Sequence, residues 1–428
     1  MGNTVNQTKT EFERGVLTVT LIFYIFEHGN RNEMKSALED VKIADFTQMM
    51  QGPWATQKLA EMGADVIKIE RIGGEWERAL EAGGELYEGT SPFFLAMNRN
   101  KRSITLDLKS EEGREVALDI IRESDVLVEN FRPGVMEKFG LGYDDVCEAN
   151  PEIIYVSGSG FGSSGPYVDR PGQDLLLQAM TGLANQTGRR DDPPTPAGSA
   201  VVDEHSSMLI AFSILVALYH KQRTGEGQRA EVNLMNSAID FQCQEITAAL
   251  SMDMEVDRSE AGISSPFNSG PYGIYETADG HVAIAMAPVD VLADTLGLEE
   301  LQQYDGTEFE DRDEIKRVLE AYTRECETES LLTRLLDADV WASKVNDFHE
   351  MAEDPQVQHN DMVRTFEHPE VGEYTTTGIP VTLSETPGEI TSQPPMPGEH
   401  TDEVLGELDY SDEQIRKLHE NEVVSRTD

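Results

Sequence analysis

The chain has 428 residues, of which 39% are apolar, so it can bury a sizeable core and is not a disordered acidic segment. Its 34 basic and 80 acidic side chains leave a formal charge of −46, which excludes nucleic acid as an expected partner because phosphate would be repelled. Arginine outnumbers lysine, 22 to 12. Such an acidic surface stays solvated where salt screens charge, so we expect a halophilic protein; an ordinary acidic enzyme is the alternative.

The first 33 residues do not fit the pattern of the rest of the chain. An uncharged apolar run at 15–26 is shorter than the roughly 20 residues of a membrane span, and it lacks the flanks of a signal peptide. Regular patterning begins after Met34, so we interpret residues 1–33 as a non-native or disordered extension and expect no membrane partner. The three cysteines are far apart and form no CxxC motif, which favours a cytoplasmic protein without disulfides.

Strands and helices alternate from residue 41 onward. The apolar pattern predicts strands over 41–46, 64–70, 103–108, 125–129 and 153–157, and helices over 52–62, 111–123 and 135–149. This alternation is typical of an α/β protein whose parallel sheet is covered on both faces. The first strand is not followed by GxGxxG. Four glycines after the fifth strand favour a plain flexible loop over a phosphate-binding one: Gly158, Gly160, Gly162 and Gly165.

The second half of the chain opens with a long amphipathic helix predicted over 203–222. Its apolar side carries Met208, Phe212, Leu215, Val216 and Tyr219. After a turn at 223–228, a strand and a helix, two strands over 272–277 and 281–287 flank a hairpin turn. Residues 289–360 are expected to be mostly helical, and 362–400 to hold short strands. A second, smaller domain is therefore expected near 226–325.

A basic stretch stands out against the acidic background: Arg99, Lys101, Arg102 and then Lys109. Two interpretations remain open. Arginine forks match phosphate oxygens, so the stretch is a candidate site for an anionic ligand. Alternatively, these cations neutralise nearby acids on a solvated face.

Asp203 lies among small residues just before an apolar helix. The pattern alone favours a helix N-cap. The functional alternative is a carboxylate nucleophile, which needs no base to activate it and has room for a substrate to approach. Asp174 also stands at a predicted helix start, where capping is the default. His205 is a candidate proton relay, but a structural role is favoured; since no histidine lies between His28 and His205, a Ser/His/Asp triad is not expected in the main domain.

Six segments resemble the class III CoA-transferase family, which contains formyl-CoA transferase, carnitine CoA-transferase and the α-methylacyl-CoA racemases. They are DFT with GPWATQ at 45–57, GADVIKIER at 63–71, NRNKRS at 98–103, LDLK at 106–109, ENFRPG at 129–134 and RTGEGQ at 223–228. The resemblance implies a large Rossmann-like parallel-sheet domain from both chain ends (34–225 and 326–428), a smaller α+β domain (226–325) and an interlocked homodimer.

The resemblance also implies the site. The Asp that attacks the acyl-CoA thioester in the family's transferases matches Asp203. The CoA contacts match Met50, Gln51, Arg71, Leu106, Asp107, Leu108, Lys109, Asn130, Phe131, Arg132, Lys138, Pro171, Gly172, Gln173 and Asp174. A CoA thioester enters as substrate, and no tightly bound cofactor or metal is expected.

The implied activity is transfer of CoA from an acyl-CoA donor to a carboxylic acid, through an anhydride and then a CoA thioester on Asp203. Succinyl-CoA and mesaconate are an expected pair. A racemase is one alternative, but in the family it pairs an Asp at position 174 with an upstream histidine, in a region that has none here. An acyl-CoA hydrolase, using the same nucleophile with water, is another. An intact Asp203 argues against a non-catalytic CoA-binding protein.

Overall fold

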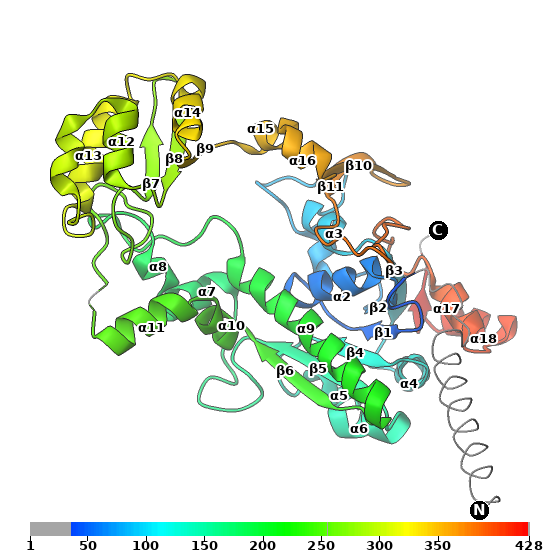
Figure 1. Ribbon diagram of the computed structural model, residues 1–428. Helices are drawn as coiled ribbons and strands as arrows, with labels where there is room; N and C mark the ends of the chain where they lie inside the picture. Colours follow the sequence, from blue (N-terminus) through cyan, green and yellow to red (C-terminus); the bar gives the residue numbers. More distant parts are fainter. Residues whose placement is uncertain (1–35, 255, 427–428) are drawn as a thin grey trace, which may run out of the picture.

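The computed structural model describes residues 36–254 and 256–426, so our interpretation of residues 1–33 lies outside the described residues. A seven-stranded sheet in the order β12-β3-β2-β1-β4-β5-β6 forms its centre (Figure 1). Neighbouring strands run parallel except β12, which is antiparallel to β3. The strands are β1 (Lys42–Asp45), β2 (Asp65–Glu70), β3 (Lys101–Leu106), β4 (Val126–Glu129), β5 (Ile154–Ser159), β6 (Arg229–Asn233) and β12 (Val424–Ser425). The predicted α/β class with a large parallel sheet is confirmed.

Two hydrophobic cores cover the two faces of this sheet, because successive side chains of a strand point to opposite sides. On β1, Ile43 belongs to one core and Ala44 to the other. The first core packs under α2 (Gln51–Glu61) and α9 (Val201–Thr224). The second packs under α4 (Glu111–Arg122), α5 (Val135–Lys138), α6 (Tyr143–Ala149), α17 (Thr401–Glu407) and α18 (Asp412–Glu420).

A second sheet with its own core stands at one end of the molecule (Figure 1). It joins β7 (Gly273–Glu276), β8 (His281–Ala285) and β9 (Trp341–Lys344), all antiparallel, so the predicted hairpin is present. Its helices are α12 (Val289–Leu296), the 3₁₀ helix η2 (Glu299–Tyr304), α13 (Arg312–Thr323) and α14 (Thr328–Asp337). The expected small-domain range, 226–325, includes β6 of the large sheet and omits β9. We propose that the small domain runs from β7 to β9.

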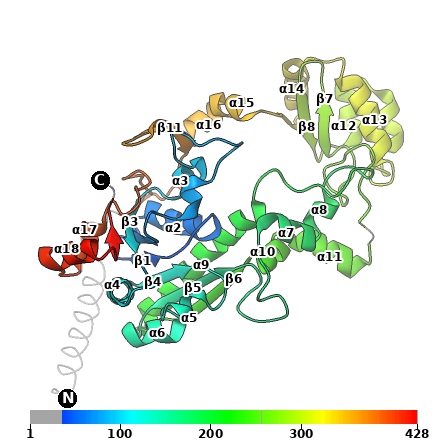
Figure 2. The same cartoon turned by 180° about the vertical axis from the view of Figure 1, so that it is seen from behind.

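The chain returns from the small sheet to the large one through α15 (Phe348–Glu353), α16 (Pro355–His359) and a hairpin of β10 (Val363–His368) and β11 (Gly372–Thr377) (Figure 2). It then forms α17, α18 and β12 at the edge of the large sheet, so residues near both ends of the described chain contribute strands to the same sheet. The remaining elements are the 3₁₀ helix η1 (Trp76–Ala79), α3 (Pro92–Met97), α7 (Asp174–Met180), α8 (Leu183–Gln186), α10 (Leu234–Phe241) and α11 (Cys243–Met252).

The single helix predicted over 135–149 is wrong, because the chain forms two helices there. Gly140 has a φ of 67°, a left-handed conformation that ends a right-handed helix, and Gly142 is the N-cap of α6. The apolar pattern continued through this break and concealed it.

The long helix predicted over 203–222 is present as α9. Its apolar side is exposed, with Phe212 at 64% and Tyr219 at 61% of full exposure. The buried side combines small residues with three larger apolar ones and packs against the sheet and α2; it consists of Val202, Ser206, Ser207, Ile210, Ala211, Ile214 and Ala217. Among the described helices, α9 is the one long and apolar enough to cross a membrane, but one side of it packs as a core helix.

Candidate functional site

The candidate site lies at the carboxyl ends of the parallel strands, where β1 meets β4. The strand order reverses there, because β2 and β3 extend to one side of β1 while β4, β5 and β6 extend to the other. Ligands of open α/β sheets bind at such a switch point. Gln48 and Asn130 meet across it: the Gln48 backbone N–H donates to Asn130 Oδ1 (2.8 Å), and Asn130 Nδ2 donates to the Gln48 carbonyl (2.8 Å).

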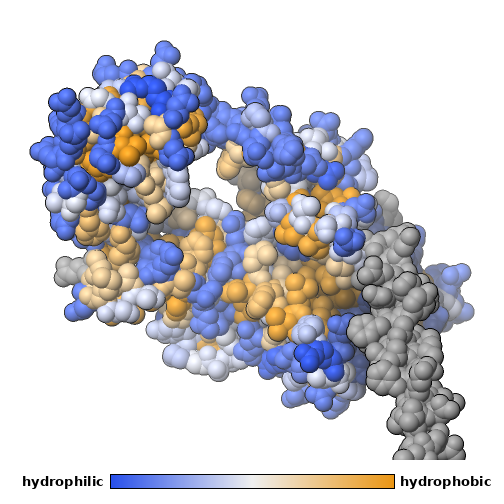
Figure 3. All heavy atoms as spheres, in the orientation of Figure 1, coloured by the Kyte–Doolittle hydropathy of each residue, from blue (hydrophilic) through white to orange (hydrophobic). Residues whose placement is uncertain are grey.

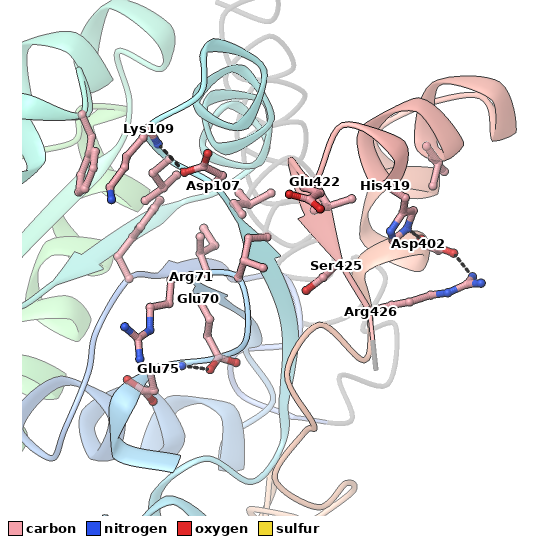
Figure 4. Close-up of a pocket in the computed structure, with 18 of the residues that line it drawn as sticks. Glu70, Arg71, Glu75, Asp107, Lys109, Asp402, His419, Glu422, Ser425 and Arg426 are labelled. Atoms are coloured by element: carbon pink, nitrogen blue, oxygen red, sulfur yellow. Dashed lines mark hydrogen bonds and ion pairs between the residues drawn. The ribbon is translucent and has the colours of Figure 1, made fainter. Parts of the chain in front are cut away.

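A larger cavity of about 1420 Å³ extends from this point toward the sheet edge (Figure 4). The structure brings together six of the residues predicted from the sequence in its wall: Arg71, Leu106, Asp107, Leu108, Lys109 and Phe131. Arg71 follows β2 directly, and 107–109 follow β3, so both groups stand at the carboxyl edge of the sheet. Its lining combines apolar side chains with four cations, Arg71, Lys109, Arg416 and Arg426, and six carboxylates, and its volume is large enough for a nucleotide.

The opposite wall of the larger cavity comes from the C-terminal segment, which sequence reasoning missed. It includes Asp402, Arg416, His419 and Ser425 (Figure 4). β12 brings this segment into place, since it pairs with β3, and the Asp107 N–H donates to the Val423 carbonyl (2.8 Å). Such a long-range antiparallel pairing leaves little local signal in a two-residue strand.

A smaller cavity of about 210 Å³ holds Asp203. Seven further predicted residues line it: Gln51, Asn130, Phe131, Arg132, Pro171, Gly172 and Gln173. The two cavities share Gln48, Trp76 and Phe131, which we call the neck. The two cavities therefore adjoin at these three residues, on the side of the smaller cavity that the larger one faces.

Three predicted site residues line neither cavity. Met50 is the N-cap residue of α2, and its carbonyl lies 3.4 Å from Ser207 Oγ. Lys138 is exposed at the end of α5. Asp174 is buried and holds α9 in place: its Oδ2 accepts from the backbone N–H groups of Val202 (2.8 Å) and Asp203 (3.2 Å).

Asp203 itself is not the helix N-cap, contrary to the reading that its pattern favoured. It is the third residue of α9. The backbone N–H groups at the start of α9 have no acceptor within the helix, and Asp174 from α7 accepts from them instead. Burial raises the pKa of the Asp203 carboxyl to about 7, and the neighbouring carboxylates of Asp174 and Glu204 add to that rise. No donor within residues 36–254 and 256–426 hydrogen-bonds the Asp203 carboxylate, which leaves it available to a substrate.

Close backbone packing shapes the smaller cavity. An added Cβ at Gly160 would stand 2.5 Å from Gly172 Cα, and one at Gly158 would stand 2.8 Å from Gln51 Oε1. A side chain at Gly160 would therefore collide with the backbone of Gly172, whereas at Gly158 it would meet the end of the Gln51 side chain. Gln51 in turn donates from Nε2 to Ser206 Oγ (2.7 Å), tying α2 to the first turns of α9.

The basic stretch is mainly structural. Arg99 is fully buried, and its Nε donates to Glu61 Oε1 (2.7 Å). Lys101 is also buried and lies 3.0 Å from Asp45 Oδ2, while Arg102 pairs with Asp65 and with acids of α17. The ligand-site interpretation is wrong for these three, and it holds as a prediction only for Lys109, which lines the larger cavity.

His205 does not face Asp203 as a relay in this arrangement. Its Nε2 lies 2.8 Å from Asp240 Oδ2 of α10, so it links two helices. Among the described residues no cluster of three or more His, Cys, Asp or Glu side chains is arranged to hold a metal.

Comparisons with known proteins all point to one family. The family model of CoA-transferase family III matches residues 38–401. The chain is 36% identical to succinyl-CoA:mesaconate CoA-transferase of Haloarcula hispanica, over 87% of this chain and 96% of that protein. It is 33% identical to formyl-CoA:oxalate CoA-transferase of Streptomyces coelicolor, over 91% and 99% of the two chains.

The fold agrees with these relatives. The structure is similar to the crystal structure of a CAIB/BAIF family protein from Brucella suis, with a TM-score of 0.77 and 29% identity over 88% of this chain and 100% of that one. The chain belongs to CoA-transferase family III and is an enzyme of that family.

Proposed function

We propose that this enzyme transfers CoA from an acyl-CoA donor to a carboxylic acid, with Asp203 as the nucleophile. The observation that carries this proposal is that the cavity holding Asp203 adjoins the larger cavity at the three neck residues. A nucleotide held between Arg71 and Lys109 leaves the thioester end of CoA to reach Asp203. The raised pKa of Asp203 also makes its ionised form a stronger nucleophile than an exposed carboxylate.

The chemistry proceeds in four exchanges. An Asp203 oxygen attacks the thioester carbonyl, the C–S bond breaks, and a mixed anhydride and CoA thiolate result. The thiolate attacks Cγ of Asp203, which releases the donor acid and leaves an aspartyl-CoA thioester. The acceptor carboxylate attacks Cγ and expels the thiolate, forming a second anhydride. The thiolate then attacks the acceptor carbonyl and frees Asp203.

This sequence exchanges one thioester for another, so its energetics require no ATP. CoA acts as a substrate, and its binding in the larger cavity makes each thiolate attack effectively intramolecular. Asp174 contributes by position: it occupies the first N–H groups of α9 and thereby fixes the helix turn that carries Asp203.

For the acids exchanged we propose C4–C5 dicarboxylates, with succinyl-CoA as donor and mesaconate as acceptor. The support is the similarity to two succinyl-CoA:mesaconate CoA-transferases from Haloarcula. A panel of acyl-CoA donors against carboxylic acids, followed by mass spectrometry of the acyl-CoA products, tests this pair. Transfer to other acids but not to mesaconate would contradict the proposed pair of substrates. Release of free CoA with every acid would indicate a hydrolase.

We also propose a homodimer that covers the exposed side of α9. Figure 3 shows apolar surface along the middle of the face where Figure 1 places α9. Its exposed apolar residues are Met208, Phe212, Leu215, Val216 and Tyr219. A contiguous apolar patch on a chain of charge −46 marks an association surface, and the interlocked dimer that the family resemblance implies supplies a second copy as the partner.

The proposed setting is a cytoplasm of high salt. Support comes from the formal charge of −46 and from the three cysteines, all of them free thiols: Cys147, Cys243 and Cys326. Screening by salt reduces the self-repulsion of such a surface.

A further inference from the structure

Trp76 occupies the boundary between the two cavities. It is the first residue of η1, lines both cavities, and remains 46% exposed. The other two neck residues, Gln48 and Phe131, follow the carboxyl ends of β1 and β4. The neck thus lies where the larger cavity adjoins the smaller one that holds Asp203.

The position of Trp76 is fixed from both sides. Its Nε1 donates to Gln48 Oε1 (3.1 Å), and the backbone of Gln48 is held by Asn130. The residues on either side of Trp76 in the chain are also held, because both bind the buried Glu70 carboxylate: the Glu75 backbone N–H donates to it at 3.0 Å and Arg78 Nε at 2.7 Å. An exposed indole on an anchored 3₁₀ turn is a preformed contact surface rather than a disordered side chain.

We propose that Trp76 is a positioning residue that packs against the uncharged arm joining the nucleotide of CoA to its thiol, and that it retains the CoA thiolate while Asp203 carries the acyl group. This inference rests on the proposed function. After the first attack the C–S bond is broken, so no covalent bond holds CoA near the anhydride. Loss of the thiolate at that stage leaves the anhydride to water.

The shape of the neck fits this role. The charged nucleotide belongs in the larger cavity with Arg71 and Lys109, and the sulfur belongs beside Asp203, so the arm is the part of CoA that crosses the neck. Its amides and methylenes suit the aromatic faces of Trp76 and Phe131. The Trp76 N–H is already used by Gln48, so we expect contact with the ring face rather than a hydrogen bond to CoA.

The first test measures, for each variant, how much CoA is transferred to the acceptor acid and how much is released as free CoA. Trp76→Ala, Trp76→Phe and the unmodified enzyme are supplied with succinyl-CoA and mesaconate; free thiol and mesaconyl-CoA are quantified together. We expect Trp76→Ala to raise the ratio of free CoA to transferred CoA at least fivefold, and Trp76→Phe, which keeps a ring, to stay within twofold of the unmodified enzyme. Trp341→Phe, on β9 and 63% exposed, is the control and should change nothing.

The second test is independent of turnover. The chain has three tryptophans, so Trp54→Phe with Trp341→Phe leaves Trp76 as the sole indole reporter. CoA should change its emission, whereas adenosine 3′,5′-bisphosphate, which lacks the arm, should not. Calorimetric binding of CoA without a change in emission, or an unchanged product ratio in Trp76→Ala, would overturn the role of Trp76. Failure of the unmodified enzyme to bind CoA at all would instead overturn the proposed function, and the role of Trp76 with it.

Discussion

Asp174 accepts a hydrogen bond from the backbone N–H of Asp203 (3.2 Å), so two carboxylates meet at the first turn of α9. Asp174 caps the helix, and its charge adds to the rise in the Asp203 pKa that burial produces. The same contact therefore fixes the position of the nucleophile and makes it more basic.

The pH dependence of the reaction follows from this arrangement. In the proposed mechanism Asp203 attacks as a carboxylate, so kcat/KM should rise with pH through an inflection near 7 and then level off. Asp174→Asn removes one of the charges that raise this pKa, and its inflection should lie at lower pH. Initial rates across a pH series, with folding checked by circular dichroism, measure both. An inflection near the ordinary value of 3.8 in the unmodified enzyme would show that Asp203 is not the titrating group.

The protonation of Asp203 should affect the free energy of unfolding in the opposite direction: this free energy should fall as pH rises. The folded chain binds the Asp203 proton more tightly than the unfolded chain, whose carboxyl has its ordinary pKa near 3.8, so this stabilising effect is complete below about pH 4 and is lost as pH rises through about 7. Asp203→Asn should therefore raise the free energy of unfolding at pH 8 by on the order of 2 kcal/mol and change it little at pH 4. Urea unfolding at the two pH values gives the difference; a destabilised variant at pH 8 would contradict it.

Lys101 and Lys109 form a matched pair that separates structural from ligand-binding cations. Lys101 Nζ donates to Asp45 Oδ2 (3.0 Å), the Pro53 carbonyl (2.9 Å) and Asn98 Oδ1 (2.9 Å), all buried. Lys101→Met leaves Asp45 without its closest cation and should cost about 3–5 kcal/mol of stability.

Lys109→Met should behave in the opposite way. Lys109 is exposed at the rim of the larger cavity, so stability should change by less than about 0.5 kcal/mol. The Kd for CoA should rise about fivefold, which corresponds to about 1 kcal/mol. Calorimetry and urea unfolding of both variants decide the assignment, and a Lys109→Met enzyme that unfolds easily yet binds CoA normally would reverse it.

The dimer proposal predicts a monomer when charge is placed on α9. Phe212→Asp puts a carboxylate in the centre of the exposed apolar side, and Phe348→Asp, at an 87% exposed position on α15, is the control. Sedimentation velocity should give a monomer for the first variant and an unchanged mass for the second. A dimer that persists in Phe212→Asp would place the interface elsewhere.

Salt should strengthen both folding and CoA binding. The chain and the CoA phosphates are both anionic, and the Debye length falls from about 10 Å at 0.1 M to about 3 Å at 1 M salt. Screening removes repulsion over the whole surface, while close contacts at Arg71 and Lys109 partly survive. Calorimetric titration of CoA between low and molar KCl should therefore show affinity rising; a steady fall in a chain that stays folded would mean that local cations dominate.

The sequence was enough to predict the central sheet, because buried parallel strands such as β4 and β5 carry continuous apolar runs. It was not enough to tell that the apolar side of α9 is exposed in this chain, since an apolar helix side has the same composition whether or not it packs on the core. Nor did it distinguish Arg99 from Lys109: the partner of Arg99 is Glu61 at the end of α2, and only tertiary packing brings the two together.

The family resemblance assigned Arg71, Asp107 and Asn130 to the candidate site, and in the structure each of them directly follows a strand of the large sheet. Trp76 was missed because its role depends on the meeting of two cavities, which no local pattern records. Asp174 was assigned as a CoA contact, yet it lines neither cavity and caps a helix 29 residues away in the chain.

The most direct test of the central claim is mass spectrometry of the peptide that carries residue 203. The enzyme is incubated with succinyl-CoA alone and then quenched with hydroxylamine, which converts an aspartyl thioester or anhydride to a hydroxamate. The proposed mechanism predicts a hydroxamate on Asp203, absent without acyl-CoA and absent in Asp203→Asn. An unmodified Asp203 in an enzyme that still transfers CoA, or a hydroxamate on a different residue, would contradict it.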